Sequence, residues 1–214
     1  MIKAFNHLRI LIITGILAMA CDKSEEFSAI QLKPKPSGLN AYLNVNIDGA
    51  SYQLNDGTDG YKSALSYQFP ADGHYGQSEF GSSIYNDSST LEFRVGYTHQ
   101  AKSREELVAI LTKESQSISL GYFDDDGVFL IDKNGFLFEI IELEYPLGPG
   151  VGYSSHQEEQ PVSSHFYIND YFAGEQNNSI WLKGNFDLKL CGGYSEKDIL
   201  GEFFLEFPIC CFSN

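Results

Sequence analysis

Oxygen-bearing side chains gather at two tight turns in the middle of the chain. Asp124–Asp126 precede Gly127, and Asp132 and Asn134 follow a short apolar run. Several oxygens from one loop can hold calcium, but an EF-hand loop needs them at positions one, three and five, with glycine at six and glutamate at twelve. Here Gly127 comes three residues after Asp124. The spacing therefore predicts plain turns between strands and no metal site.

A second group that could do chemistry lies near residue 160. His156, Glu158, Glu159 and His165 could bind zinc or transfer protons. Their spacing is not that of one helix face, and neither a Gly-x-Ser-x-Gly elbow nor a phosphate-binding glycine loop occurs in the chain. We interpret them as solvated loop residues, and we predict no catalytic residue, no enzyme activity and no cofactor.

Aromatic side chains offer another hypothesis, a platform on which sugar rings could stack. Tyr145 and Tyr153 lie in the Pro- and Gly-rich stretch 145–164, which has no periodicity, and Trp181 follows it. Such side chains combine an apolar ring with a polar edge, and long irregular segments often carry function. We therefore predict ligand-binding residues at Tyr145, Tyr153, His156 and Trp181.

The elements that must position these residues are mostly strands. Leu43, Val45 and Ile47 alternate with polar residues before Asp48–Gly49, which is a strong hairpin signal, and the same alternation recurs as far as Phe207. About ten such strands do not fit comfortably into one open sheet. We predict an all-β fold, a two-sheet antiparallel β-sandwich with one short helix, and a β-barrel as the alternative.

The helix is expected after Ser103. Ser103 and Glu106 match a capping box, in which the serine accepts from the amide of Glu106 and the glutamate reaches back. An apolar stripe follows, and the helix is expected to end near Ser115.

Near the C-terminus, Cys191, Cys210 and Cys211 permit at most one intramolecular disulfide. A bridge from Cys191 to Cys210 or Cys211 would join a late strand to the chain end. Buried free thiols are the alternative that stays open.

The first 21 residues direct the chain out of the cytoplasm. Lys3 and Arg9 precede an apolar run and then Cys21, which is the order of a secretory signal. The run is too short to span a bilayer, which takes about 20 residues. With cysteine at the cleavage point the segment resembles a bacterial lipoprotein signal, which implies that Cys21 is acylated. We predict a signal peptide at 1–20, a lipidated tether at 21–39 and a single domain at 40–214.

Charge limits the partners. The chain carries a formal net charge of −15, and without the signal 12 basic residues face 29 acidic ones. Such a chain repels phosphate backbones, so we expect no nucleic-acid partner. The membrane is expected as a partner through the lipid alone.

Both ends of the domain resemble uncharacterised cell-envelope lipoproteins from Bacteroidota-type bacteria. The resemblance rests on the residues from Asn46 to Tyr52 and on the hairpin formed by 183–190 and 201–207. It implies a β-sandwich displayed from a membrane, in the bacterial cell envelope, as an outer-membrane and in some cases surface-exposed lipoprotein. We expect a non-enzymatic binding module for a glycan, a peptide or a protein. The alternatives are a structural subunit of a cell-surface assembly and a carboxylate-dependent hydrolase.

Overall fold

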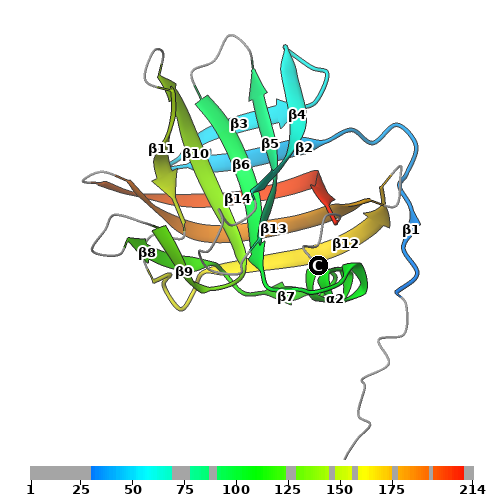
Figure 1. The fold of residues 1–214 in the computed structure, drawn as a ribbon. Helices are drawn as coiled ribbons and strands as arrows, with labels where there is room; N and C mark the ends of the chain where they lie inside the picture. The colour runs from blue at the N-terminus through cyan, green and yellow to red at the C-terminus, as the bar shows by residue number, and fades with distance from the viewer. Residues whose placement is uncertain are drawn as a thin grey trace, which may run out of the picture.

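The fold is all-β, as the sequence predicts (Figure 1). The computed structural model describes residues 30–68, 78–86, 91–123, 129–144, 148–155, 159–174, 178–192 and 195–209. They contain one helix, α2 (Arg104–Leu111). The strands are β1 (Lys33–Pro34), β2 (Tyr42–Ile47), β3 (Ala50–Asn55), β4 (Tyr61–Gln68), β5 (Ser78–Asn86), β6 (Leu91–His99), β7 (Ser115–Gln116), β8 (Leu120–Phe123), β9 (Phe129–Lys133), β10 (Phe136–Glu144), β11 (Gly148–Ser154), β12 (His165–Ala173), β13 (Ser179–Gly192) and β14 (Ser195–Pro208).

Twelve of the described strands join one sheet, and β8 and β9 form a separate hairpin. The order along the sheet is β3-β2-β14-β13-β11-β10-β6-β5-β4, with β12 branching from β13. The sheet curls so that β4, β5, β6, β10 and β11 cross β12, β13 and β14 (Figure 1). The arrangement is a nearly closed barrel. The barrel alternative therefore describes it better than two separate sandwich sheets.

Two long strands explain why the sheet is continuous. β13 and β14 have 14 residues each and pair along their whole length. The first half of β13 pairs with β12, and at its far end Cys191 pairs with Ser154 of β11. Because β13 serves both halves, they cannot separate into two sheets.

Phenylalanine rings fill the space that the curled sheet encloses. Phe136 stacks on Phe166 with ring centroids 4.3 Å apart, and Phe138 lies 5.1 Å from Phe186. All four rings are fully buried. Alternate residues of the strands supply them, so period-two patterning directly builds this core.

The capping box is confirmed at the start of α2. The amide of Glu106 donates to Ser103 Oγ, and Glu106 Oε2 accepts from the amide of Lys102, one residue earlier than expected. The helix ends at Leu111 and not near Ser115, because the chain turns at Thr112 into the short strand β7.

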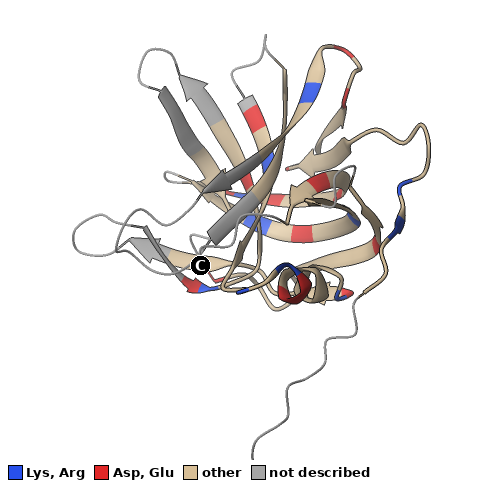
Figure 2. Cartoon of the chain, turned by 45° about the vertical axis from the view of Figure 1, so that its right-hand side comes forward, with Lys and Arg blue, Asp and Glu red and all other residues tan. Residues whose placement is uncertain are grey.

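The last part of the predicted tether lies on the domain. We call residues 33–39 the N-terminal strap. Within it, Lys33 and Pro34 pair in parallel with Phe172 and Ala173 of β12. The ammonium of Lys33 lies over the Phe172 ring, and the partly buried Leu39 packs against the core. Figure 2 shows the basic residues of this segment at the edge of the molecule.

Candidate functional site

A cavity of about 470 Å³ opens beside β12, where the end of α2 meets the sheet. We call it the edge pocket. The residues around it include two tyrosines, two asparagines, a glutamate and a threonine. Its lining residues are Thr112, Glu114, Tyr167, Ile168, Asn169, Tyr171 and Asn185.

A β-bulge gives the edge pocket its shape. Ile168 pairs with Gly184 and Asp170 with Lys183, so Asn169 is an extra residue without a register partner on β13. A bulge bends its strand and re-aims the side chains next to it. Gly184 is required here, because a Cβ at this position would lie 2.3 Å from the carbonyl oxygen of Tyr167. The bulge and the glycine together bring the Tyr167 backbone close to β13.

The other wall of the edge pocket is fixed by the turn after α2. The buried amide of Gln116 donates to the carbonyls of Ile110 and Lys113, which caps the helix end. β7 then pairs with β12, and the amide of Ile168 donates to the carbonyl of Glu114 over 2.8 Å. These bonds hold Thr112 and Glu114 against the bulged strand.

The groups of the edge pocket suit a polar ligand with apolar faces. Tyr167 is 39% exposed and offers a ring for stacking. Asn185 Nδ2 donates to Asn169 Oδ1 over 2.9 Å, so the two amides are held together while their other donors and acceptors face solvent. An aromatic ring can contact apolar C–H surface, and the amides can bind hydroxyl groups.

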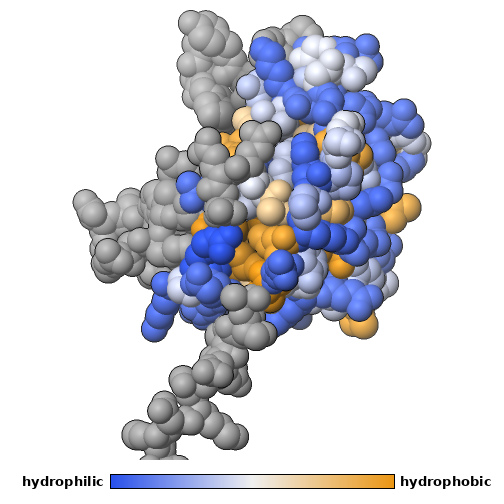
Figure 3. Space-filling model, turned by 90° about the vertical axis from the view of Figure 1, so that its right-hand side faces the viewer, coloured by the Kyte–Doolittle hydropathy of each residue, from blue (hydrophilic) through white to orange (hydrophobic). Residues whose placement is uncertain are grey.

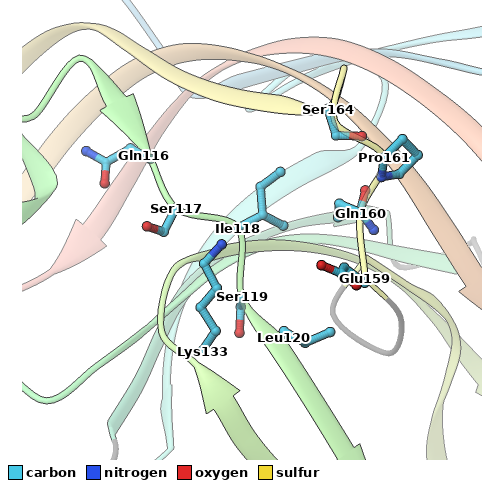
Figure 4. A pocket seen from close by; sticks show the side chains of 10 residues that line it. All are labelled: Gln116, Ser117, Ile118, Ser119, Leu120, Lys133, Glu159, Gln160, Pro161 and Ser164. Atoms are coloured by element: carbon cyan, nitrogen blue, oxygen red, sulfur yellow. The ribbon is translucent and has the colours of Figure 1, made fainter.

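A second cavity, of about 350 Å³, lies beside residues 159–164, which precede β12 (Figure 4). We call it the loop pocket. Lys133 and Glu159 approach it from opposite sides (Figure 4). Its lining includes no aromatic ring, so it offers no stacking surface. The lining residues are Gln116, Ser117, Ile118, Ser119, Leu120, Lys133, Glu159, Gln160, Pro161 and Ser164.

Trp181 does not form the exposed platform that the sequence suggests. Its ring stacks on Phe204 with centroids 4.9 Å apart, and Lys35 Nζ of the N-terminal strap lies 4.1 Å above it. Both ring faces are therefore covered, and the residue is buried. Trp181 is part of the attachment of the strap.

Tyr153 lies at the other end of the molecule. Its hydroxyl is 2.9 Å from Ser195 Oγ, and Lys197 Nζ lies 4.9 Å from its ring centroid. Tyr153 is next to Gly192, eleven residues from Trp181 along β13, which is roughly 36 Å at 3.3 Å per residue. The structure thus keeps these two predicted residues apart, and neither lines the edge pocket.

The remaining predicted sites lie mostly outside the described residues, namely Cys21, Tyr145, His156, Cys210 and Cys211. Cys191 is described and buried at the end of β13. A disulfide between Cys191 and the C-terminal pair stays a prediction.

Sequence reasoning missed Tyr167, Tyr171 and the two asparagines of the edge pocket. In an extended segment, alternation alone would place Tyr167, Asn169 and Tyr171 on one exposed face. Ordinary alternation does not reveal the bulge, nor that a distant helix end packs beside it. That packing is what turns the exposed residues into a cavity.

Two buried polar features lie elsewhere. Arg94 Nη1 donates to Glu139 Oε2 over 3.0 Å across β6 and β10. At the end of β6, burial lowers the pKa of His99 to about 4, although the negative charge of Glu106 acts in the opposite direction and raises it. No group of three His, Cys, Asp or Glu side chains in the described ranges could hold a metal ion.

Comparisons with protein families, curated proteins and solved structures give no match for this chain. In the described part of the chain, no helix has the length and hydrophobicity to cross a membrane. The fold and the edge pocket thus define the protein as an all-β domain with a polar, tyrosine-lined cavity on its outer surface.

Proposed function

We propose that this chain is a membrane-anchored lipoprotein of the bacterial cell envelope, and that its β domain is a non-enzymatic binding module for a glycan. The signal segment that ends at Cys21 supports the anchor. The edge pocket supports the ligand class, because it combines tyrosine rings with paired amides. That combination is the single observation on which the glycan proposal depends.

The chemistry of the edge pocket supports binding over hydrolysis. Among its lining residues, Glu114 is the sole carboxylic acid. Cleavage of a glycosidic bond by the usual mechanisms needs two carboxyl groups about 5 to 9.5 Å apart. A single acid can accept hydrogen bonds from sugar hydroxyls, which is the role we assign to Glu114.

The test is an oligosaccharide screen on the full chain in detergent, read by melting temperature and then by calorimetry. A ligand at 100 times its Kd should stabilise the fold by about 2.7 kcal/mol. We expect Tyr167→Ala to weaken binding at least tenfold, because stacking on this ring is lost. The matched control is Tyr52→Ala on β3, since Tyr52 is 37% exposed and lies outside the edge pocket.

Two outcomes would overturn the glycan proposal. One is that no oligosaccharide in the screen raises the melting temperature. The other is that Tyr52→Ala weakens binding as much as Tyr167→Ala. The anchor is tested separately, by incorporation of labelled palmitate in the native cell. We expect labelling of the native chain and none of Cys21→Ser.

A second candidate function is a structural subunit, and the sheet ends favour it. β3 and β4 are the two terminal strands of the large sheet, and no ladder joins them among the described residues. Unpaired strand edges can accept a strand from a partner. A molecular mass that rises with protein concentration, without any glycan effect, would favour this candidate.

A further inference from the structure

A row of polar residues crosses five neighbouring strands at the edge pocket. Tyr167 of β12 pairs with Asn185 of β13, which pairs with Glu202 of β14. Glu202 pairs in turn with Asn44 of β2, and Asn44 with Gln53 of β3. We call these five residues the polar row. It starts inside the edge pocket and runs along the outside of the sheet.

The polar row is accessible and partly fixed. Tyr167, Glu202 and Gln53 are exposed, and the two asparagines are half-buried. Asn44 Nδ2 donates to Glu202 Oε1 over 2.9 Å. A hydrogen bond of this kind restrains the rotamers of both side chains, so less side-chain entropy is lost when a ligand binds. Each amide still has donors and acceptors for a ligand.

The spacing of the polar row suits a polymer. Neighbouring strands lie about 4.8 Å apart, so five strands span roughly 19 Å. An extended chain of β-1,4-linked hexoses advances by a similar distance per ring. A chain that lies across the strands could therefore present one ring to each strand, which a compact ligand could not do.

The surroundings of the polar row favour an uncharged chain with apolar ring faces. Leu200, the residue on β14 next to this row, is 58% exposed and offers apolar surface. Acidic Asp187 and Glu202 stand on the same face as the exposed Lys183, in a chain with a net charge of −15. An anionic polysaccharide would be repelled. Figure 3 shows the side of the molecule that carries β1, where a patch of apolar residues is bordered by hydrophilic ones.

We propose that the edge pocket holds the end ring of a neutral, extended β-1,4-linked hexose chain, and that the following rings lie along the polar row. This inference rests on the proposed glycan-binding function and deepens it. Tyr167 stacks on the end ring, Asn185 and Asn44 bind hydroxyls of the next rings, and Gln53 reaches the far end of the chain.

The test measures affinity against oligomer length for the full chain in detergent. The probes are β-1,4-linked glucose, mannose and N-acetylglucosamine oligomers of two to six rings, studied by calorimetry. We expect affinity for one series to rise at least tenfold from two to five rings and then to level off. A net hydrogen bond of 0.5 to 1.5 kcal/mol for each added contact gives this scale.

Variants locate the added rings. We expect Asn44→Ala and Gln53→Ala each to weaken five-ring binding roughly three- to tenfold, and to leave two-ring binding unchanged. Tyr167→Ala weakens every length. Asn40→Ala is the matched control, because Asn40 is an exposed amide just before β2 and outside the polar row; its affinities should equal those of the unmodified chain.

The possible failures are distinguishable. Equal affinity for two and five rings overturns the polar row and leaves the edge pocket as the glycan site. Failure of all three series, while another glycan of the screen binds, likewise overturns this inference alone. Failure of every glycan overturns the proposed function with it.

Discussion

Two outward faces of the same sheet differ in how far solvent reaches their polar side chains. On β12, β13, β14, β2 and β3, the outward residues include Asn185 and Glu202, which solvent reaches. On β5, β6 and β10, the outward residues include Ser83, Arg94 and Glu139, which are shielded, with Glu139 only 4% exposed. We call the first the open face and the second the covered face. Polar residues alternate with core residues on both.

The difference shows that burial, and not residue type, decides the role of a polar side chain. On the covered face a charge must have a partner, and Arg94 and Glu139 pair directly across two strands. Small residues allow close packing there, since a Cβ at Gly96 would lie 2.9 Å from Leu137 Cδ1. On the open face neutral amides stay hydrated, so they remain available to a ligand.

The largest expected effect comes from breaking the ion pair of the covered face. Glu139→Gln removes the carboxylate and leaves the Arg94 guanidinium buried without this counter-charge. We expect a loss of about 3 kcal/mol in the free energy of unfolding, measured by urea denaturation.

Glu202→Gln is the matched control on the open face, because Glu202 is exposed and bonds only another surface side chain among the contacts described. We expect it to change stability by less than about 0.5 kcal/mol. Equal losses for the two variants would contradict the distinction between the faces.

Acid is expected to produce the next effect, at the buried end of β6. His99 is 2% exposed, its Nδ1 accepts from the amide of Ala101, and burial lowers its pKa to about 4. The unfolded chain binds this proton near pH 6.5, so unfolding takes up a proton between these values. Stability is therefore expected to fall as the pH drops from about 6.5 to 4, by at most about 1.4 kcal/mol per pH unit.

The measurement is urea denaturation at several pH values, for the native chain and for His99→Asn. Asparagine can still accept a hydrogen bond from the Ala101 amide, but it does not titrate. We expect a flatter profile for the variant between pH 4 and 6.5. Identical slopes would show that other groups cause the acid sensitivity.

The smallest effect concerns the border of the open face, where the N-terminal strap covers Trp181. Lys35→Ala removes the ammonium over the indole, which should cost about 0.5 to 1 kcal/mol. Trp181 is the only tryptophan of the chain, so its fluorescence reports on the strap. We expect a red shift for Lys35→Ala. Lys183 is an exposed lysine on β13, the strand that carries Trp181, and Lys183→Ala should leave the emission unchanged.

Local patterns predicted the elements well. Alternation identified strands such as β2, β6 and β13, Asp48–Gly49 forms the turn between β2 and β3, and Ser103 caps α2. Alternation did not identify β5 or β11. These features depend on residues close together in the sequence. The continuous sheet depends on β13 being shared by β12 and β11, which is a property of distant pairings that periodicity does not encode.

The candidate site was harder to predict for the same reason. The stretch 145–164 was expected to be irregular and to carry the ligand, but Gly148–Ser154 of it form strand β11. Its residues Glu159–Pro161 line the loop pocket. The edge pocket instead needs the bulge at Asn169 and the helix end fixed by Gln116. The bulge lies in the pairing of β12 with β13, about 15 residues apart, and the helix end reaches the bulged strand through the pairing of β7 with β12, about 50 residues apart. No local motif predicts either pairing.

The docked N-terminal strap limits how far the domain can stand from a bilayer. Lys33 is twelve Cα-to-Cα steps from Cys21, and a fully extended chain of that length reaches at most about 43 Å. Tyr171 of the edge pocket is next to Phe172, where the strap is attached. A lipidated chain would thus hold the edge pocket close to the point where the tether leaves the domain. Long polymers would then have to approach the pocket parallel to the lipid surface.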